Sequence, residues 1–412
     1  MSLRFRLLTG MLSASILAFP ALAADNKSLQ IVVSKSDQSL ALYENGEIVA
    51  TSKVSTGKAG HETPSGIFSI LEKRKYHESN IYSAAPMPFM QRLTWSGIAL
   101  HEGKVPNYPA SHGCVRLPSK FAQSLFGETR YGVHVIITDR PVSLRSVQHS
   151  ALFEPRDDAD DGKLLLSDVE LRPATFDAAL GTVEVAVNEK TQAIKPMAKG
   201  KEPSPLRILI TRRGEREKVM DIQAVLTRLG FDAGAPDGYT GEMTISAVNG
   251  FKRWKGLKTT GPLLTDDFVA ALYASADEDH PPNGQIMVRQ DFKPLFEAAI
   301  DIKDPEVALG THFFEAVAVN RAAGTAEWNG VTLENRLPAA ARKRLGITVT
   351  EAPGGFDQLS AVLGRLEIPA EIRSRIEKEL STGSSITVSD LSHQMETGMG
   401  TDFITVTKEG PV

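Results

Sequence analysis

Short runs of hydrophobic residues with strand-like lengths dominate the first part of the chain. The runs at 29–33 and 40–43 precede Asn45-Gly46, a pair that is typical of a two-residue hairpin turn. Later runs of the same kind are 48–50, 67–70, 98–101 and 133–137. This pattern predicts a small, mainly-β domain over residues 28–140, with one helical stretch at 120–126.

The hydrophobic spacing becomes helical after residue 218. Apolar residues recur every three or four positions over 219–229 and 245–254, and a third short amphipathic stretch covers 266–273. We therefore predict a three-helix domain at 218–275. An acidic run and a stretch rich in lysine, proline and glycine precede it, so residues 141–217 are predicted to be a linker and irregular region.

The last third of the chain, 281–412, mixes strand-like and helical patterns. Residues 386–388 and 403–406 are predicted strands, and 369–380 is a predicted helix. We interpret this part as a C-terminal accessory domain of mixed α/β character and unknown role. The predicted fold class is multidomain and α+β overall.

The first 23 residues have the pattern of an export signal. Arg4 and Arg6 precede an apolar stretch at 7–19, and Ala21-Leu22-Ala23 has the small residues of a cleavage site. The apolar stretch is shorter than the ~20 residues that a membrane-spanning helix needs. We therefore predict a signal peptide at 1–23, and no transmembrane segment after its removal.

Charge and cysteine content exclude several classes of function. The 46 basic and 50 acidic residues give a net charge of −4, which argues against a nucleic-acid-binding protein. A single cysteine excludes a disulfide framework and a site with several thiolate ligands. No metal or organic cofactor is predicted.

The one cysteine, Cys114, lies in the segment that carries the candidate chemistry. A thiol needs a neighbouring base or cation to become a good nucleophile. His101 ends a predicted strand, and the loop 104–110 can fold back and bring it to Cys114. His112 and Arg116 lie two residues on either side of Cys114, so in an extended chain they share its face.

Three further assignments follow from this segment. The amides of Gly113 and Cys114 are candidates for an oxyanion hole, and we assign Ser111, Gly113 and Arg116 to oxyanion or substrate binding. Structural alternatives stay open at this point. Cys114 would then be a small buried hydrophobe, His101 a core histidine bonded to backbone, and Arg116 a member of a surface ion pair.

The segment Ser-His-Gly-Cys-Val-Arg at 111–116 resembles the signature of the YkuD-type L,D-transpeptidases. His101 and the turn Thr-Pro-Ser-Gly at 63–66 match further parts of that pattern, and the similarity covers residues 28–139. Fewer residues separate His101 from Cys114 in the sequence than in better-known members, so we expect a shortened loop over the cleft. Leu-Gly-Phe at 229–231 and Asp-Gly-Tyr-Thr-Gly at 237–241 are among the motifs by which residues 218–273 resemble the type 1 peptidoglycan-binding domain.

The resemblance implies a periplasmic enzyme that acts on peptidoglycan stem peptides. Cys114 would attack the carbonyl of the diamino acid at position three, expel D-alanine and form a thioester. His101 would be the base and His112 would support it. An amine of a second stem would then complete a 3→3 cross-link.

Three alternatives to this reaction remain. An amine of an outer-membrane protein or lipoprotein could be the acceptor. Water could replace the amine, which would make the protein a carboxypeptidase or endopeptidase. The protein could also be a non-catalytic scaffold that binds the wall.

Overall fold

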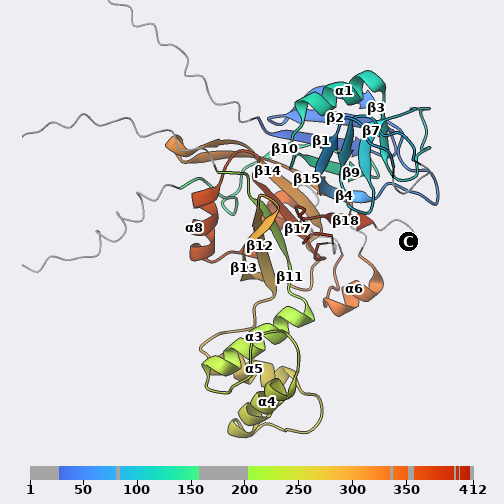
Figure 1. The fold of residues 1–412 in the computed structure, drawn as a ribbon. Coiled ribbons are helices and arrows are strands. Elements are labelled where there is room, and N and C mark those ends of the chain that lie inside the picture. Colours follow the sequence, from blue (N-terminus) through green and yellow to red (C-terminus); the bar gives the residue numbers. More distant parts are fainter. Residues whose placement is uncertain are drawn as a thin grey trace, which may run out of the picture.

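The structure is a computed structural model of the chain, and its described residues are 27–79, 84–156, 203–334, 337–350, 357–393, 396–398 and 400–408. It has two β-rich parts that pack against each other and a helical module that projects from one of them (Figure 1). The predicted signal peptide lies outside the described residues. No helix within the described part is long and apolar enough to cross a membrane.

The amino-terminal part is built on a six-stranded sheet. Its strands pair in an antiparallel manner except β1 and β9, which are parallel. The predicted hairpin turn at Asn45-Gly46 is confirmed, because Glu44 pairs with Glu47 across it. In sheet order, the strands are β18 (Thr405–Lys408), β4 (Ser65–Ser69), β9 (His134–Thr138), β1 (Leu29–Ser34), β2 (Ser39–Glu44) and β3 (Glu47–Lys53).

A second, four-stranded sheet in the same part carries the candidate site. Its strands in order are β5 (Glu72–Arg74), β6 (Met90–Arg92), β7 (Ala99–Glu102) and β8 (Val115–Leu117), and helix α1 (Ser119–Glu128) follows β8. A hydrophobic core that includes Ile31, Phe68, Leu100 and Val115 unites residues of both sheets. Burial of such side chains contributes roughly 1.5–3 kcal/mol each. This core holds β7 and β8 in place.

The carboxy-terminal part is an eight-stranded sheet whose strands come from distant regions of the chain. Its core includes Phe153, Ile208, Phe314 and Trp328. In sheet order, the strands are β10 (Arg145–Val147), β15 (Thr325–Leu333), β14 (Thr311–Asn320), β17 (Ser385–Ser389), β11 (Arg207–Arg212), β12 (Gly284–Gln290), β13 (Lys293–Ile302) and β16 (Leu366–Glu367). The helical segments of this part are η1 (Arg321–Ala323), α6 (Ala339–Arg344), α7 (Gln358–Leu363) and α8 (Ala370–Glu379).

The predicted three-helix module is present as an insertion between the neighbouring strands β11 and β12. It comprises α3 (Glu215–Arg228), α4 (Glu242–Trp254) and α5 (Asp266–Ser275). Leu226, Phe251 and Phe268 are fully buried in its own core. The amide of Arg213 donates to the carbonyl of Asn283 (3.0 Å), which closes the base of the insertion.

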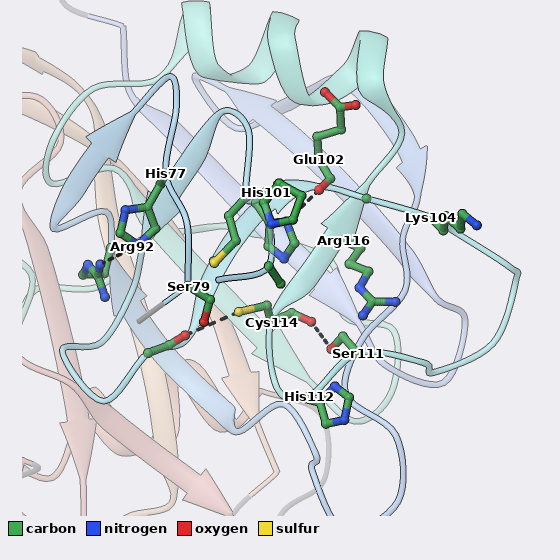
Figure 2. A pocket seen from close by; sticks show the side chains of 15 residues that line it. His77, Ser79, Arg92, His101, Glu102, Lys104, Ser111, His112, Cys114 and Arg116 are labelled. Carbon is green, nitrogen blue, oxygen red and sulfur yellow. Dashed lines mark hydrogen bonds between the residues drawn. The ribbon is translucent and has the colours of Figure 1, made fainter. Parts of the chain in front are cut away.

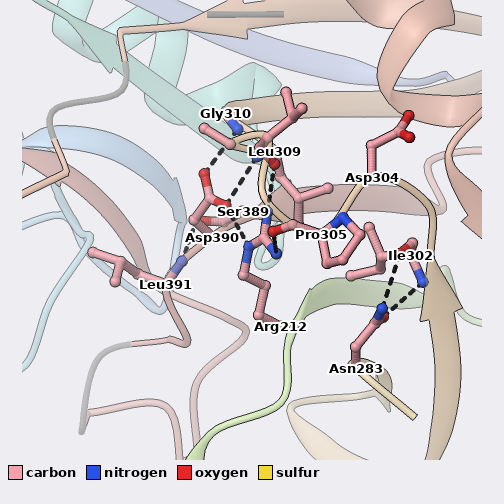
Figure 3. A network of polar contacts seen from close by, with 12 residues as sticks. Arg212, Asn283, Ile302, Asp304, Pro305, Leu309, Gly310, Ser389, Asp390 and Leu391 are labelled. Carbon is pink, nitrogen blue, oxygen red and sulfur yellow. Dashed lines mark hydrogen bonds and ion pairs between the residues drawn. The ribbon is translucent and has the colours of Figure 1, made fainter. Parts of the chain in front are cut away.

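A buried ion pair stabilises the sheet where the module leaves it. Asp390 accepts hydrogen bonds from Arg212 Nε (2.8 Å) and from the amides of Leu309 and Gly310 (2.9 Å each), as Figure 3 shows. The Arg212 guanidinium also donates to the carbonyl of Pro305 (2.7 Å). Because every charge is matched by hydrogen bonds, the cost of burying the pair is offset.

The observed strand pairing differs from the predicted organisation in two respects. Residues 207–212, which we placed in the linker and irregular region 141–217, form a strand inside the eight-stranded sheet, and 145–147 form an edge strand of the same sheet. Strand β18, which we placed in the accessory domain, pairs with β4 of the amino-terminal part. The C-terminal residues therefore contribute to both β-rich parts. Residues 157–202 lie outside the described residues.

The two β-rich parts share a buried interface. Val32, Ile67 and Ile136 of the six-stranded sheet pack with Phe313 and Val331 of the eight-stranded sheet. Polar side chains cross the same interface: His134 Nε2 and Ser385 Oγ are 2.9 Å apart, Ser28 donates to Glu315, and Arg207 pairs with Asp402 (3.1 Å). This combination fixes the carboxy-terminal part against the sheet that supports the candidate site.

Candidate active site

The pairing of β7 with β8 brings the predicted site residues together. The strands are parallel, and His101 lies opposite Arg116 while Leu100 lies opposite Val115. Leu100 and Val115 are fully buried in the core, so the alternate residues of both strands face the other way. His101, Cys114 and Arg116 line one pocket on that face, as the two-residue spacing predicted for Cys114 and Arg116 (Figure 2).

Thr63 holds the turn that presents Cys114. Its hydroxyl donates to the carbonyl of Gly113 (2.7 Å) and accepts from the amide of Gly57 (2.8 Å). Gly113 has a φ of +115°, which side-chain-bearing residues rarely adopt. Ser111 Oγ accepts from the Gly113 amide (3.2 Å) and donates to the Cys114 carbonyl. The Gly113 amide, which we predicted as an oxyanion-hole donor, is therefore bonded to Ser111.

The sulfur of Cys114 lies against the loop between β6 and β7. Its thiol donates to the carbonyl of Gly97 (3.4 Å). Burial raises the pKa of the Cys114 thiol, and a hydrogen bond from the Ala99 backbone and the positive charges of Arg116 and Arg92 oppose this effect. The resting thiol is therefore protonated at neutral pH, and a base must remove its proton.

His101 has one ring nitrogen that is free to accept a proton. Its Nδ1 lies 2.6 Å from the carbonyl oxygen of Glu102. A carbonyl can only accept, so Nδ1 carries the hydrogen and Nε2 has a free lone pair. Burial lowers the pKa of His101 to about 4, although the Glu102 hydrogen bond opposes the shift. His101 is thus a neutral imidazole at physiological pH.

The predicted supporting residue, His112, lies at the rim of the pocket. It is exposed, and its ring contacts that of His61 edge to face at a centroid distance of 4.8 Å. In Figure 2, His112 and His101 are on opposite sides of Cys114. Residual desolvation and the positive charge of Lys58 lower the pKa of His112. This position suits contact with a ligand at the rim and does not place His112 beside the His101 ring.

The pocket is rich in basic groups. It has a volume of about 330 Å³, and Arg92, Lys104 and Arg116 contribute cationic side chains to its lining. Arg92 is paired with Glu72 (2.8 Å), whereas Arg116 has no ion pair or side-chain hydrogen bond within the described part of the chain. An unmatched guanidinium in a cavity suits a carboxylate ligand. Among the described residues, no group of three His, Cys, Asp or Glu side chains could hold a metal ion.

The sequence reasoning missed several residues that shape this pocket. His77 and Arg92 line it from the segment before β7, and their side chains lie 3.4 Å apart. Gly97 accepts the thiol hydrogen bond described above. None of them belongs to a local motif, and only strand pairing brings them to Cys114. The Thr-Pro-Ser-Gly turn at 63–66 was the one available signal for the role of Thr63.

Comparison with known families confirms the predicted resemblance. Residues 28–137 match the family model of the L,D-transpeptidase catalytic domain, YkuD. Residues 215–263 match the model described as "Putative peptidoglycan binding domain". The chain therefore carries a YkuD-type L,D-transpeptidase catalytic domain and a peptidoglycan-binding domain, as the motifs at 111–116 and in the helical module predicted.

Part of the chain is similar to individual proteins and solved structures. The chain is 28% identical over 147 residues to a Bacillus subtilis protein named "Putative L,D-transpeptidase YqjB", with 31% of this chain and 82% of the relative covered. Similar solved structures include an L,D-transpeptidase from Mycobacterium smegmatis (20% identity, TM-score 0.26, 27% of this chain covered). Another is from Stackebrandtia nassauensis (27% identity, TM-score 0.26, 31% of this chain covered). The chain spans 59% and 63% of these two structures, respectively.

Proposed function

We propose that this protein is a peptidoglycan L,D-transpeptidase that uses Cys114 as nucleophile and His101 as general base. The observation that carries the proposal is the shared pocket in which a lone cysteine and a histidine of fixed tautomer meet an unpaired arginine. Stem peptides carry several carboxylates, which matches the basic lining. Export to the periplasm through the predicted signal peptide is part of the proposal.

In the first step, the substrate is acylated onto the enzyme. The Cys114 proton moves to Nε2 of His101 as the sulfur bonds to the carbonyl carbon of the diamino acid. The carbon–nitrogen bond to D-alanine then breaks, and the departing nitrogen takes the proton from His101. A thioester and free D-alanine are the products.

In the second step, an acceptor amine attacks the thioester carbonyl. Its proton passes through His101 to the sulfur, the carbon–sulfur bond breaks, and a 3→3 amide is left. Because His101 is neutral at physiological pH, it can accept a proton in each step and return it. Arg116 is proposed to bind a carboxylate of the donor stem, and His112 to contact substrate at the rim.

The helical module is proposed to hold the enzyme at the wall. Its exposed aromatic side chains, Tyr239 and Trp254, each lie near a cation, Arg216 and Lys255 respectively. Such pairs offer a flat apolar face and a hydrogen-bond donor to a glycan or peptide. Sedimentation with purified sacculi tests this proposal, with a Tyr239→Ala/Trp254→Ala double variant expected to remain in the supernatant.

The reaction is tested by mass spectrometry of muropeptides after incubation of the mature protein with disaccharide-tetrapeptide. We expect a cross-linked dimer that lacks one D-alanine, and its absence with Cys114→Ala or His101→Gln. Tripeptide products without a dimer would indicate that water is the acceptor and that the protein is a carboxypeptidase. The absence of both products and of any thioester in a folded, reduced protein would refute a catalytic role.

A further inference from the structure

The C-terminal segment reaches the loop that positions the candidate nucleophile. Glu396 accepts two backbone hydrogen bonds from this loop, one from the amide of Trp95 (2.6 Å) and one from the amide of Ser96 (3.0 Å). The two amides are consecutive, so one carboxylate binds both. Hydrogen bonds to an ionised acceptor are roughly twice as strong as neutral ones.

The loop in question connects β6 to β7 and contacts the sulfur directly. The amide of Leu93 donates to the carbonyl of Ile98 (2.8 Å), and Gly97, with a φ of +114°, completes the turn. The Gly97 carbonyl then accepts the Cys114 thiol hydrogen (3.4 Å), and the Ala99 backbone bonds the sulfur. The Glu396 carboxylate thus binds the amide of Ser96, the residue just before the glycine whose carbonyl accepts the thiol hydrogen.

Glu396 is itself fixed by buried neighbours. The hydroxyl of Thr401 donates to the Glu396 carbonyl (3.0 Å), and the hydroxyl of Thr397 accepts from the amide of Ile404 (3.2 Å). Thr397, Thr401 and Ile404 are almost completely buried. The next residues form β18, which pairs with β4 in the six-stranded sheet of the amino-terminal part. Because this segment is well anchored, the Glu396 carboxylate can hold the loop between β6 and β7 in one position.

A second anchor ties the same segment to the eight-stranded sheet. Asp402 pairs with Arg207 of β11, and the Arg207 guanidinium donates to the carbonyls of Gly132 and Gly383. Phe403 packs with Leu209 and Met287 of the same sheet. The segment therefore connects the eight-stranded sheet of the carboxy-terminal part to the loop beside Cys114.

We propose that Glu396 is a positioning residue for the transpeptidase reaction: by binding the amides of Trp95 and Ser96, it sets the Gly97 carbonyl that aligns the Cys114 sulfur. This inference rests on the proposed function. It gives the C-terminal region a role in catalysis, although none of the described residues of that region lines the pocket. The consequence is a slower acylation step when the two hydrogen bonds are removed.

The test compares rates of Cys114 acylation in the full mature protein, with imipenem as the probe and intact-mass spectrometry as readout. Glu396→Ala removes both acceptors, and we expect acylation to slow by about 10- to 100-fold, as a small misplacement of a reacting group can do. Glu396→Gln keeps one acceptor oxygen, so its acylation rate should lie between those of wild type and Glu396→Ala. Glu379→Gln, an exposed site on α8 with no side-chain contact to the catalytic part, is the matched control and should react at the wild-type rate.

A second readout separates positioning from a general effect on stability. The rate of alkylation of Cys114 by iodoacetamide, measured against pH, reports the apparent pKa of the thiol. We expect the alkylation profile to shift in Glu396→Ala, because the loop holds two groups that act on the thiol in opposite directions: the Gly97 carbonyl accepts its hydrogen, and the Ala99 backbone bond lowers its pKa. If Glu396→Ala does not fold, Thr401→Val serves as the second variant, because it removes the hydrogen bond to the Glu396 carbonyl. It should change the acylation rate and the alkylation profile in the same way, but less strongly.

The outcomes distinguish this inference from the proposed function. Wild-type protein that forms no imipenem adduct would refute the proposed function. Wild-type protein that forms the adduct, with Glu396→Ala reacting equally fast and with an unchanged alkylation profile, would refute the positioning role alone. A lower melting temperature with unchanged rates would also refute it, because Glu396 would then be purely structural.

Discussion

Glu315 makes the stability of the two-part assembly depend on pH. It lies on β14, is 2% exposed, and its carboxylate accepts from Ser28 at the interface between the two β-rich parts. Burial raises the pKa of Glu315 from 4.5 to about 7, although the positive charge of Arg207 opposes the shift. We expect Glu315→Gln to remove this dependence, because glutamine does not ionise.

The magnitude follows from proton linkage. Between pH 4.5 and 7 the folded protein retains a proton that the unfolded chain has released, so the unfolding free energy falls as pH rises. The loss is about 1.4 kcal/mol per pH unit, or roughly 3 kcal/mol in total at pH 8. At pH 4 or below, both states are protonated and the penalty vanishes. The unfolding free energy of Glu315→Gln minus that of wild type should therefore be roughly 3 kcal/mol larger at pH 8 than at pH 4.

Urea unfolding at pH 4.5, 6 and 8, at constant ionic strength, measures this difference. Trp328 is 3% exposed in the same sheet, so in a Trp95→Phe/Trp254→Phe background, which removes the other two tryptophans, its fluorescence follows the transition of this part. Glu327→Gln, an exposed site on the neighbouring strand β15, controls for the loss of one negative charge. A gap between wild type and Glu315→Gln that stays constant from pH 4.5 to 8 would refute the reasoning.

Three further predictions concern the candidate site. Because burial lowers the pKa of His101 to about 4, imipenem acylation should stay near its maximum down to about pH 5, and a fall centred near pH 6.5 would contradict a buried neutral base. Gly113→Ala places a side chain at a φ of +115°, so acylation should be nearly abolished and a urea titration should show a loss of about 1–3 kcal/mol. Thr63→Val leaves the Gly57 amide and the Gly113 carbonyl unpaired, which should cost about 2–4 kcal/mol of unfolding free energy in urea; Thr63→Ser should retain most of it, and equal losses would argue against the hydroxyl bonds.

Local patterns predicted strand β7 and helix α1 near Cys114, but not the three-residue strands β5, β6 and β8 of the same sheet. The two-residue period placed Cys114 and Arg116 on one face, and the pairing of β7 with β8 confirmed that both line the pocket with His101. The same spacing also placed His112 on that face. His112 instead lies against His61 at the rim, because Gly113 has a positive φ and interrupts the extended chain.

Long-range pairing could not be predicted from the sequence. Strand β11 is a short apolar run after a polar stretch, and only its pairing with β17 and β12 makes it a central strand. The roles of Gly97 and Glu396 have the same origin, because each depends on a contact between distant segments. From the sequence, a glutamate in a polar C-terminal stretch is expected to be a solvated charge. In the structure, the pairing of β18 with β4 brings Glu396 to the loop between β6 and β7.

The insertion of the helical module between two neighbouring strands has a mechanical consequence. A module at the end of a chain is held by one linker. This one leaves after Arg212, the last residue of β11, and returns at Asn283, directly before the adjacent strand β12. Arg212 is fixed by Asp390, and Asn283 both accepts from the amide of Ile302 (2.7 Å) and donates to its carbonyl (2.9 Å). Two fixed attachment points restrict swinging of the module more than one flexible linker does. Under the proposed function, a wall strand bound to the module would therefore lie at a restricted range of distances from Cys114.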